Sequence, residues 1–131
     1  MKTGIVVFAH GSRLEAANDA VRAMAAQLAR DGGHENVDVA FLDCAPPDLV
    51  ATAGKLASQG VDLIVVIPYF LTLGRHAAED LPRIAAEVER IHKVKIRIAD
   101  ALDGHPALAR ILLDRARQAM ETGEGTSDSR S

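Results

Sequence analysis

The run VDLIVVI at residues 61–67 constrains the fold of this chain more than any other stretch of its sequence. No polar residue follows Asp62 within the run, so a strand built from it would be apolar on both faces. Such strands are typical of parallel sheets that helices cover on both sides. The run therefore predicts an α/β protein.

Three further strands and four helices are expected around this run. Strands are predicted at 4–9, 37–42, 61–67 and 94–99, and helices at 14–30, 48–59, 80–92 and 107–120. The alternating pattern of VKIRIA makes the last strand a half-exposed edge strand. This order of elements predicts a doubly wound parallel sheet with right-handed crossovers. In the flavodoxin-like strand order 2-1-3-4, helices cover both faces and the winding reverses between the first and third strands.

The connection between the third strand and the third helix is long. It runs from Pro68 to His76, whereas about two to six residues are usual for such connections. Extra length at this position is typical of a functional loop. Asp80 is expected to cap the helix that follows, with Pro82 in the first turn, where a missing N–H costs little.

Length and composition limit the class of protein. The 131 residues predict one α/β domain over residues 1–121 and a disordered, polar tail over residues 122–131. Cys44 is the only cysteine, which excludes an internal disulfide and fits a reducing cytoplasm. The first apolar run is too short for a signal peptide or a membrane span, and a net charge of −3 disfavours nucleic-acid binding. We therefore expect a cytoplasmic protein with no membrane or nucleic-acid partner.

Two histidines follow the two strands between which the winding reverses. His10 comes after the first strand and His76 after the third. Ligands of such sheets bind in the crevice outside the carboxyl ends of the strands at this switch point, so the two side chains are expected to face each other. Neutral imidazole can coordinate a divalent ion or accept a proton. One such histidine alone would more simply bond to a backbone carbonyl, but the matched pair predicts a metal or proton-transfer site.

A third metal ligand is expected from one of two acidic residues. Asp43 ends the second strand, beside the first, and is the preferred candidate. It could instead begin an Asx turn before Pro46. Glu79 lies three residues after His76 and is the second candidate, although it could merely favour the positive end of a helix.

Two arginines flank the histidines. A guanidinium group can bind a carboxylate in a bidentate manner, so Arg13 and Arg75 together indicate a substrate with several carboxylates. Each arginine taken alone could equally be a solvated surface charge.

The loops that carry the histidines lack known phosphate-binding motifs. Neither HGSRLEAAN nor LTLGRH contains a G-x-G-x-x-G or Walker A pattern. We therefore expect no nucleotide and no flavin, although Ser12 and nearby backbone donors could still hold an FMN-like phosphate. A hydrolase with Ser12 as nucleophile and His10 as base is disfavoured because no G-x-S-x-G elbow surrounds the serine. Ser12 is expected to cap a helix or to donate to a ligand.

Three segments together resemble the small sirohydrochlorin chelatases of the CbiX type, the class II chelatases. They are VVFAHGSR after the first strand, FLD at the end of the second, and PYFLTLGRHAAEDLP after the third. The resemblance extends to about Met120. It implies insertion of Co²⁺ or Fe²⁺, or Ni²⁺ in some members, into sirohydrochlorin without ATP, in cobalamin or sirohaem biosynthesis. It also implies a short form that pairs as a homodimer around one cavity.

Carried onto this sequence, the resemblance makes His10 and His76 the residues that handle the metal and accept the protons. Asp43 stands where the family usually has Glu. The residues expected to bind the substrate are Ser12, Arg13, Leu73, Gly74 and Arg75. The alternative is a flavodoxin-like module that binds a tetrapyrrole or a metal without turnover.

Overall fold

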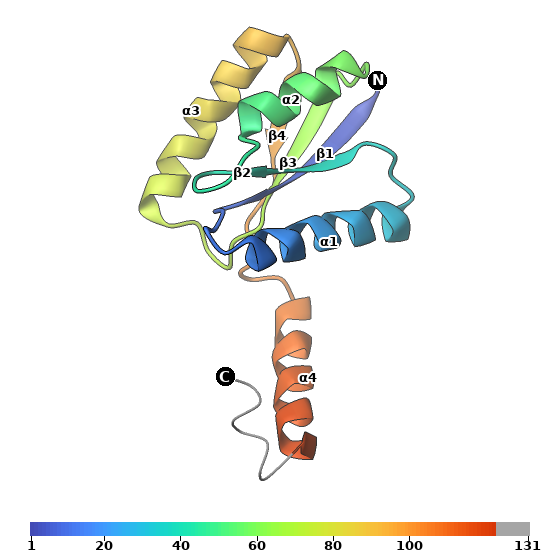
Figure 1. Cartoon of the computed structure of the whole chain (residues 1–131), viewed down its shortest axis with the longest axis vertical. Coiled ribbons are helices and arrows are strands. Elements are labelled where there is room, and N and C mark those ends of the chain that lie inside the picture. Colours follow the sequence, from blue (N-terminus) through green and yellow to red (C-terminus); the bar gives the residue numbers. More distant parts are fainter. Residues whose placement is uncertain (123–131) are drawn as a thin grey trace. The chain divides into compact units, whose positions relative to one another are not determined.

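The computed structural model describes residues 1–122, which form two compact units that divide after Ala101. The first unit contains a four-stranded parallel sheet in the order β2-β1-β3-β4 (Figure 1). Its strands are β1 (Thr3–Ala9), β2 (Val37–Phe41), β3 (Leu63–Pro68) and β4 (Lys95–Ile98). The predicted doubly wound sheet with the order 2-1-3-4 is thereby confirmed. Three helices belong to this unit, namely α1 (Glu15–Gly32), α2 (Leu49–Ser58) and α3 (Arg75–His92).

The helices of the first unit cover the sheet from opposite sides, as Figure 1 shows. On one face, Val21 and Ala25 of α1 pack against the buried side chains of β1 and β2. On the other face, α2 and α3 enclose a larger core that includes Phe8 and Ile64. Apolar side chains make up both cores, and the buried polar side chains of the described residues are Asn18 and Thr52. The sheet is therefore buried on both faces over β1, as the run at 61–67 predicts.

The strand register brings the carboxyl ends of three strands to one edge of the sheet. Ala9 pairs with Phe41 of β2, and Phe8 pairs with Pro68 of β3. Because the three strands are parallel, the loops that follow them leave the sheet side by side. This edge carries both predicted histidines.

The predicted start of α3 is wrong. The helix begins at Arg75 with Gly74 at the N-cap, so Asp80 is not the cap and Pro82 lies inside the helix. A proline there removes the bond to the carbonyl of Ala78. Both Ala78 and Pro82 are exposed, so water can bind the freed carbonyl. The loop after β3 is correspondingly shorter, and His76 lies in the first turn of a helix.

The second unit, described by itself, contains α4 (Ala107–Thr122), which extends two residues past the predicted end. None of its described side chains is buried. Whether the predicted domain continues to residue 121 stays a prediction. The tail expected at 122–131 lies, apart from Thr122, outside the described residues. Among the helices of residues 1–122, none is both long and apolar enough to cross a membrane.

Candidate functional site

A cavity of about 320 Å³ lies at the carboxyl edge of the sheet, within the first unit. It is lined by the two histidines and by residues of the loops after β2 and β3: His10, Leu42, Phe70, Thr72, Gly74, Arg75, His76 and Ala77. The structure thus brings His10 and His76 to the wall of one cavity, although 65 residues separate them along the chain. This is the position that the reversal of winding predicts for a ligand.

His10 is held mainly through its backbone. Its carbonyl accepts a hydrogen bond of 2.9 Å from the N–H of Asp43. Gly11 follows with φ of 94°, and a Cβ atom at this residue would overlap the carbonyl oxygen of Asp43. The imidazole is exposed, with Nδ1 3.3 Å from the carbonyl oxygen of Gly11. The loop therefore fixes the backbone of His10 while its ring stays accessible.

The sequence analysis missed Asn18, a buried residue of α1. Its Oδ1 accepts from the N–H of Ser12 at 3.0 Å, and its Nδ2 donates to the carbonyl of Ser12 at 2.8 Å. The signal was present, because Asn18 lies three and seven residues before Val21 and Ala25, which form the buried face of the helix. A polar residue on such a face requires a hydrogen-bond partner.

The hydroxyl of Ser12 is used within its own loop. Its Oγ accepts a hydrogen bond of 3.0 Å from the N–H of Leu14. The N-cap of α1 is Leu14, with no side-chain cap bond, so the expectation that Ser12 caps this helix is wrong. No bond from Ser12 to His10 of the kind that a serine nucleophile needs is seen in residues 1–122.

Glu15, in the first turn of α1, contacts both Asn18 and Arg22. Its carboxylate accepts hydrogen bonds from Nδ2 of Asn18 at 3.1 Å and from Arg22 at 3.3 Å. The bond from Asn18, followed by that from Arg22, holds the pKa of Glu15 below its ordinary value.

His76 and Arg75 project from the first turn of α3. Both are exposed, and Arg75 forms a weak ion pair with Glu79, at 3.8 Å, one helical turn further on. Glu79, the second candidate for a metal ligand, therefore contacts the arginine rather than a histidine.

The carboxylate of Asp43 forms a local turn. Its Oδ1 accepts from the N–H of Cys44 at 2.8 Å, and its carbonyl accepts from Ala45 at 2.8 Å. Because the carboxylate accepts from the N–H of the next residue and not from the one after it, this is not the Asx turn given as an alternative for the sequence. Across residues 1–122, no group of three His, Cys, Asp or Glu side chains is arranged to hold a metal ion. A coordinating role of Asp43 beside the two histidines stays a prediction.

The predicted substrate-binding residues differ in their relation to the cavity. Gly74 and Arg75 line it, whereas Leu73 is half-buried and, like Ser12 and Arg13, lies outside the lining. Arg13 is exposed.

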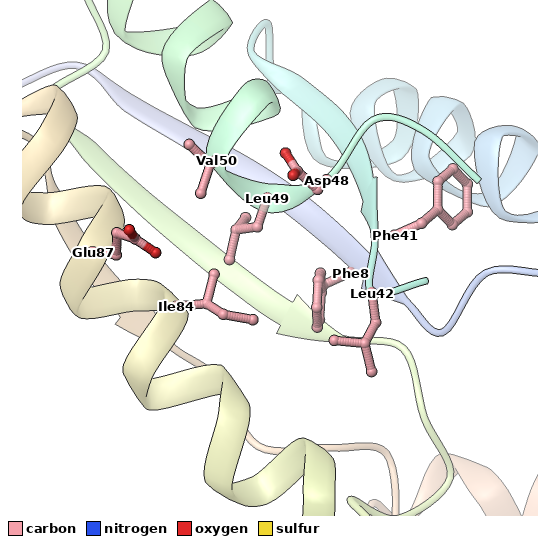
Figure 2. Close-up of a pocket in the computed structure, with 8 residues that line it drawn as sticks. All are labelled: Phe8, Phe41, Leu42, Asp48, Leu49, Val50, Ile84 and Glu87. Carbon is pink, nitrogen blue, oxygen red and sulfur yellow. The ribbon is translucent and has the colours of Figure 1, made fainter. Parts of the chain in front are cut away.

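A second cavity of about 200 Å³ lies between α2 and α3 (Figure 2). Leu42 lines both cavities, and Figure 2 shows Phe8 and Leu42 side by side with Ile84 facing them. Its polar side chains, Asp48 and Glu87, are both acidic. A ligand with several carboxylates would be repelled here, so the histidine-lined cavity is the better site for one.

Comparison with known proteins gives a consistent family. The CbiX family model matches residues 4–119. A sirohydrochlorin cobaltochelatase of Sulfurisphaera tokodaii is 32% identical over 119 residues, which cover 91% of this chain and 95% of that protein. A chloroplastic sirohydrochlorin ferrochelatase of Arabidopsis thaliana is 27% identical and covers 95% of this chain, which spans 56% of its length.

Solved structures share the fold. A structure described as a cobalamin biosynthesis CbiX protein of Marinobacter aquaeolei superimposes with a TM-score of 0.78 at 28% identity, covering 92% of this chain and 99% of its own. SirB of Bacillus subtilis with Fe³⁺ gives a TM-score of 0.79 at 23% identity, covering 88% of this chain and 46% of its own. The second likeness concerns the fold alone.

Proposed function

This chain belongs to the CbiX family, and on that premise we propose that it inserts a divalent metal ion into sirohydrochlorin. Relatives named sirohydrochlorin cobaltochelatase and ferrochelatase support this activity. The observation that carries the proposal is the pair His10 and His76 on the wall of one open cavity. The metal ion and the tetrapyrrole are both substrates.

The reaction requires little from the protein beyond this pair. A divalent ion replaces the two pyrrolic protons, so each turnover needs a site that releases the ion and bases that receive two protons. Neutral imidazoles can serve in both roles near neutral pH. Two protein ligands leave coordination positions open, whereas a closed set of four would retain the ion. We assign His10 and His76 to metal delivery and proton acceptance.

Asp43 is proposed as a third, transient ligand. The backbone N–H of Asp43 donates to the carbonyl of His10, so the side chain of Asp43 leaves the backbone next to the loop that carries His10. To reach the metal, its carboxylate would have to leave the N–H of Cys44. Breaking that hydrogen bond costs free energy, so Asp43 would bind the metal weakly and exchange readily.

The groups around the cavity suit a flat macrocycle with carboxylate substituents. Arg75 is 87% exposed, and its ion pair with Glu79 is long, so a substrate carboxylate can compete for it. Arg13 and Ser12 are proposed to bind further carboxylates. Gly74 has no side chain to obstruct the ring, and Leu73 is proposed to contact its face.

We propose that two copies of the chain assemble around one substrate. The chain spans 56% of the Arabidopsis enzyme and 46% of the SirB chain, so two copies have about the length of either. The described residues of α4 also carry exposed apolar side chains, with Leu112 69% and Leu113 62% exposed. Sedimentation at micromolar concentration is expected to give a dimer, and a monomer would contradict this arrangement.

We also propose a cytoplasmic location, which the exposed, free thiol of Cys44 supports.

The test is an anaerobic absorbance assay with sirohydrochlorin and Co²⁺, without ATP. We expect many turnovers per site, and His10→Ala and His76→Ala are each expected to lose at least about 10²-fold in kcat. His34→Ala, on an exposed residue after α1, is the matched control and should retain the wild-type rate. One product per site at most would identify a binding module, and full activity of His76→Ala would remove His76 from the mechanism.

The same assay with Fe²⁺ and Ni²⁺ compares the metals. The names of the relatives support Co²⁺ or Fe²⁺. Imidazole accepts all three ions, so the ratio of kcat/KM values, rather than affinity, identifies the preferred one.

A further inference from the structure

Two polar side chains are buried among the described residues, Asn18 at 3% exposed and Thr52 at 2%. A buried amide or hydroxyl is destabilising unless it is hydrogen-bonded. Thr52 meets this need by donating to the carbonyl of Val39 at 2.8 Å, between α2 and β2. Asn18 meets it in a different place, at the loop that carries His10.

The amide of Asn18 binds both peptide groups of a single residue. It accepts from the N–H of Ser12 and donates to the carbonyl of the same residue, while its second donor binds Glu15. Exchange of the amide oxygen and nitrogen would set donor against donor at Ser12, so the bonds fix the orientation of the amide. The side chain therefore holds the backbone of Ser12 in one place.

This attachment adds to the bond from Asp43 a second point at which the His10 loop is held. The carbonyl of His10 is bound by the N–H of Asp43, and two residues later Ser12 is bound by Asn18. Gly11, between them, has the positive φ that the turn requires. With both ends of this short turn tied, the Cα of His10 has no independent freedom relative to the sheet.

The attachment is itself supported by side chains of α1 and β2. The carboxylate of Glu15 that binds Asn18 also accepts from Arg22. The guanidinium of Arg22 lies 5.5 Å from the ring centroid of Phe41, at the end of β2. The chain of contacts thus returns to the strand end beside His10.

We propose that Asn18 is a positioning residue for metal insertion, which acts by holding the Ser12 peptide and thereby the imidazole of His10 at the cavity. The inference rests on the proposed function. A misplacement of a reacting group by about 1 Å can lower a rate by about 10²-fold. Asn18 does not line the cavity, but it holds Ser12, which is proposed to bind a substrate carboxylate, so its loss should lower kcat more than it weakens substrate binding.

The experiment compares Asn18→Leu, Asn18→Asp and Thr52→Val. Asn18→Leu removes all three bonds with little change in volume. Asn18→Asp keeps the acceptor for the N–H of Ser12 but sets a carboxylate oxygen against the carbonyl of Ser12. Thr52→Val removes the other buried polar side chain and is the matched control for loss of stability.

We expect kcat to fall at least tenfold in Asn18→Leu and Asn18→Asp, with a rise in KM for sirohydrochlorin that is smaller than the fall in kcat. Thr52→Val should lower the melting temperature without lowering kcat. Wild-type kcat in both Asn18 variants, measured below their melting temperatures, would overturn the proposal. Asn18→Asp preserves the shape of the side chain and decides the question if Asn18→Leu does not fold.

A second measurement does not depend on activity. Hydrogen exchange of the Ser12 amide should be slow in the wild type and in Thr52→Val, and at least tenfold faster in Asn18→Leu, which removes the acceptor for this N–H. Equal exchange in wild type and Asn18→Leu would refute the positioning role even if the enzyme is active. A wild-type protein that does not metallate sirohydrochlorin, but shows the expected exchange pattern, would refute the proposed function and leave the structural attachment intact.

Discussion

The loop that carries His10 and the loop that leads to His76, called here the His76 loop, are held in different ways. The His10 loop, residues 10–14, is tied by hydrogen bonds from Asp43 to His10 and from Asn18 to Ser12. The His76 loop, residues 69–74, is bound at its ends, where the N–H of Tyr69 donates to Phe8 and the carbonyl of Gly74 accepts from Ala78. Between these ends, the ring of Phe70 packs edge-on against Phe8, with centroids 6.2 Å apart.

This difference shows that one site can combine two kinds of support. Hydrogen bonds are directional and fix a peptide in one orientation, whereas apolar contacts depend mainly on the area removed from water. The His10 loop should therefore tolerate almost no change, and the His76 loop should tolerate substitutions that preserve its apolar packing. For metal insertion, such an arrangement holds one base in place while the other side of the cavity can adapt to the macrocycle.

Replacing one glycine in each loop by alanine is the most severe test of the difference between the two loops. Gly11→Ala would strain a residue at φ of 94° and drive a Cβ into the carbonyl oxygen of Asp43, so we expect a loss of more than about 4 kcal/mol in the free energy of unfolding. Gly74→Ala has φ of −69° and open space around the new Cβ, so its loss should stay below about 1 kcal/mol. Urea denaturation of both variants measures the difference. Equal losses would show that the two loops are equally constrained.

Phe70→Ala tests the apolar support of the His76 loop. Phe70 is half-buried and pairs with Phe8, so truncation should lower the free energy of unfolding by about 2 kcal/mol. Leu71→Ala is the control, because Leu71 is 64% exposed and its loss should stay within about 0.5 kcal/mol. Phe70→Leu should restore part of the stability. A loss no larger than that of Leu71→Ala would mean that apolar packing does not hold this loop.

The polar support of the His10 loop predicts a pH dependence. The pKa of Glu15 is lowered in the folded state, by the bond from Asn18 first and that from Arg22 second, so its stabilising contribution is complete above the ordinary pKa of about 4.3. The contribution is lost as the pH falls through the lower, folded pKa. The melting temperatures of wild type and Glu15→Gln should therefore differ most at neutral pH and converge in acid. Glu35→Gln, on an exposed residue, is the control, and a gap that widens below pH 4 would contradict the assignment.

The smallest effect is expected for Glu79→Gln on the other side of the cavity. The ion pair with Arg75 is exposed and 3.8 Å long, so its removal should change the free energy of unfolding by less than about 0.5 kcal/mol. The released Arg75 should bind a substrate carboxylate slightly better, which would lower KM for sirohydrochlorin by up to about twofold. A tenfold loss of kcat would instead indicate that Glu79 acts in the reaction.

Much of the fold follows from local pattern. Buried strands appear in the sequence as apolar, β-branched runs, and the helices appear as amphipathic segments, so the order of elements could be predicted along with the strand order 2-1-3-4. The position of His10 and His76 at one edge follows as well, because parallel strands place their carboxyl ends together. These features depend on periodicity and topology, which the sequence carries directly.

The tertiary structure decided how the site is held. The sequence placed the start of α3 at Asp80 because Pro82 normally marks a first turn, whereas the exposed position of Pro82 allows the helix to begin at Arg75. The attachment of Ser12 by Asn18 and the approach of Gly11 to Asp43 also required the folded chain. Each of these depends on which surface faces water or on two segments meeting in space. A one-dimensional pattern records the types of residues but not these distances, so it located the two histidines without showing what fixes one of them.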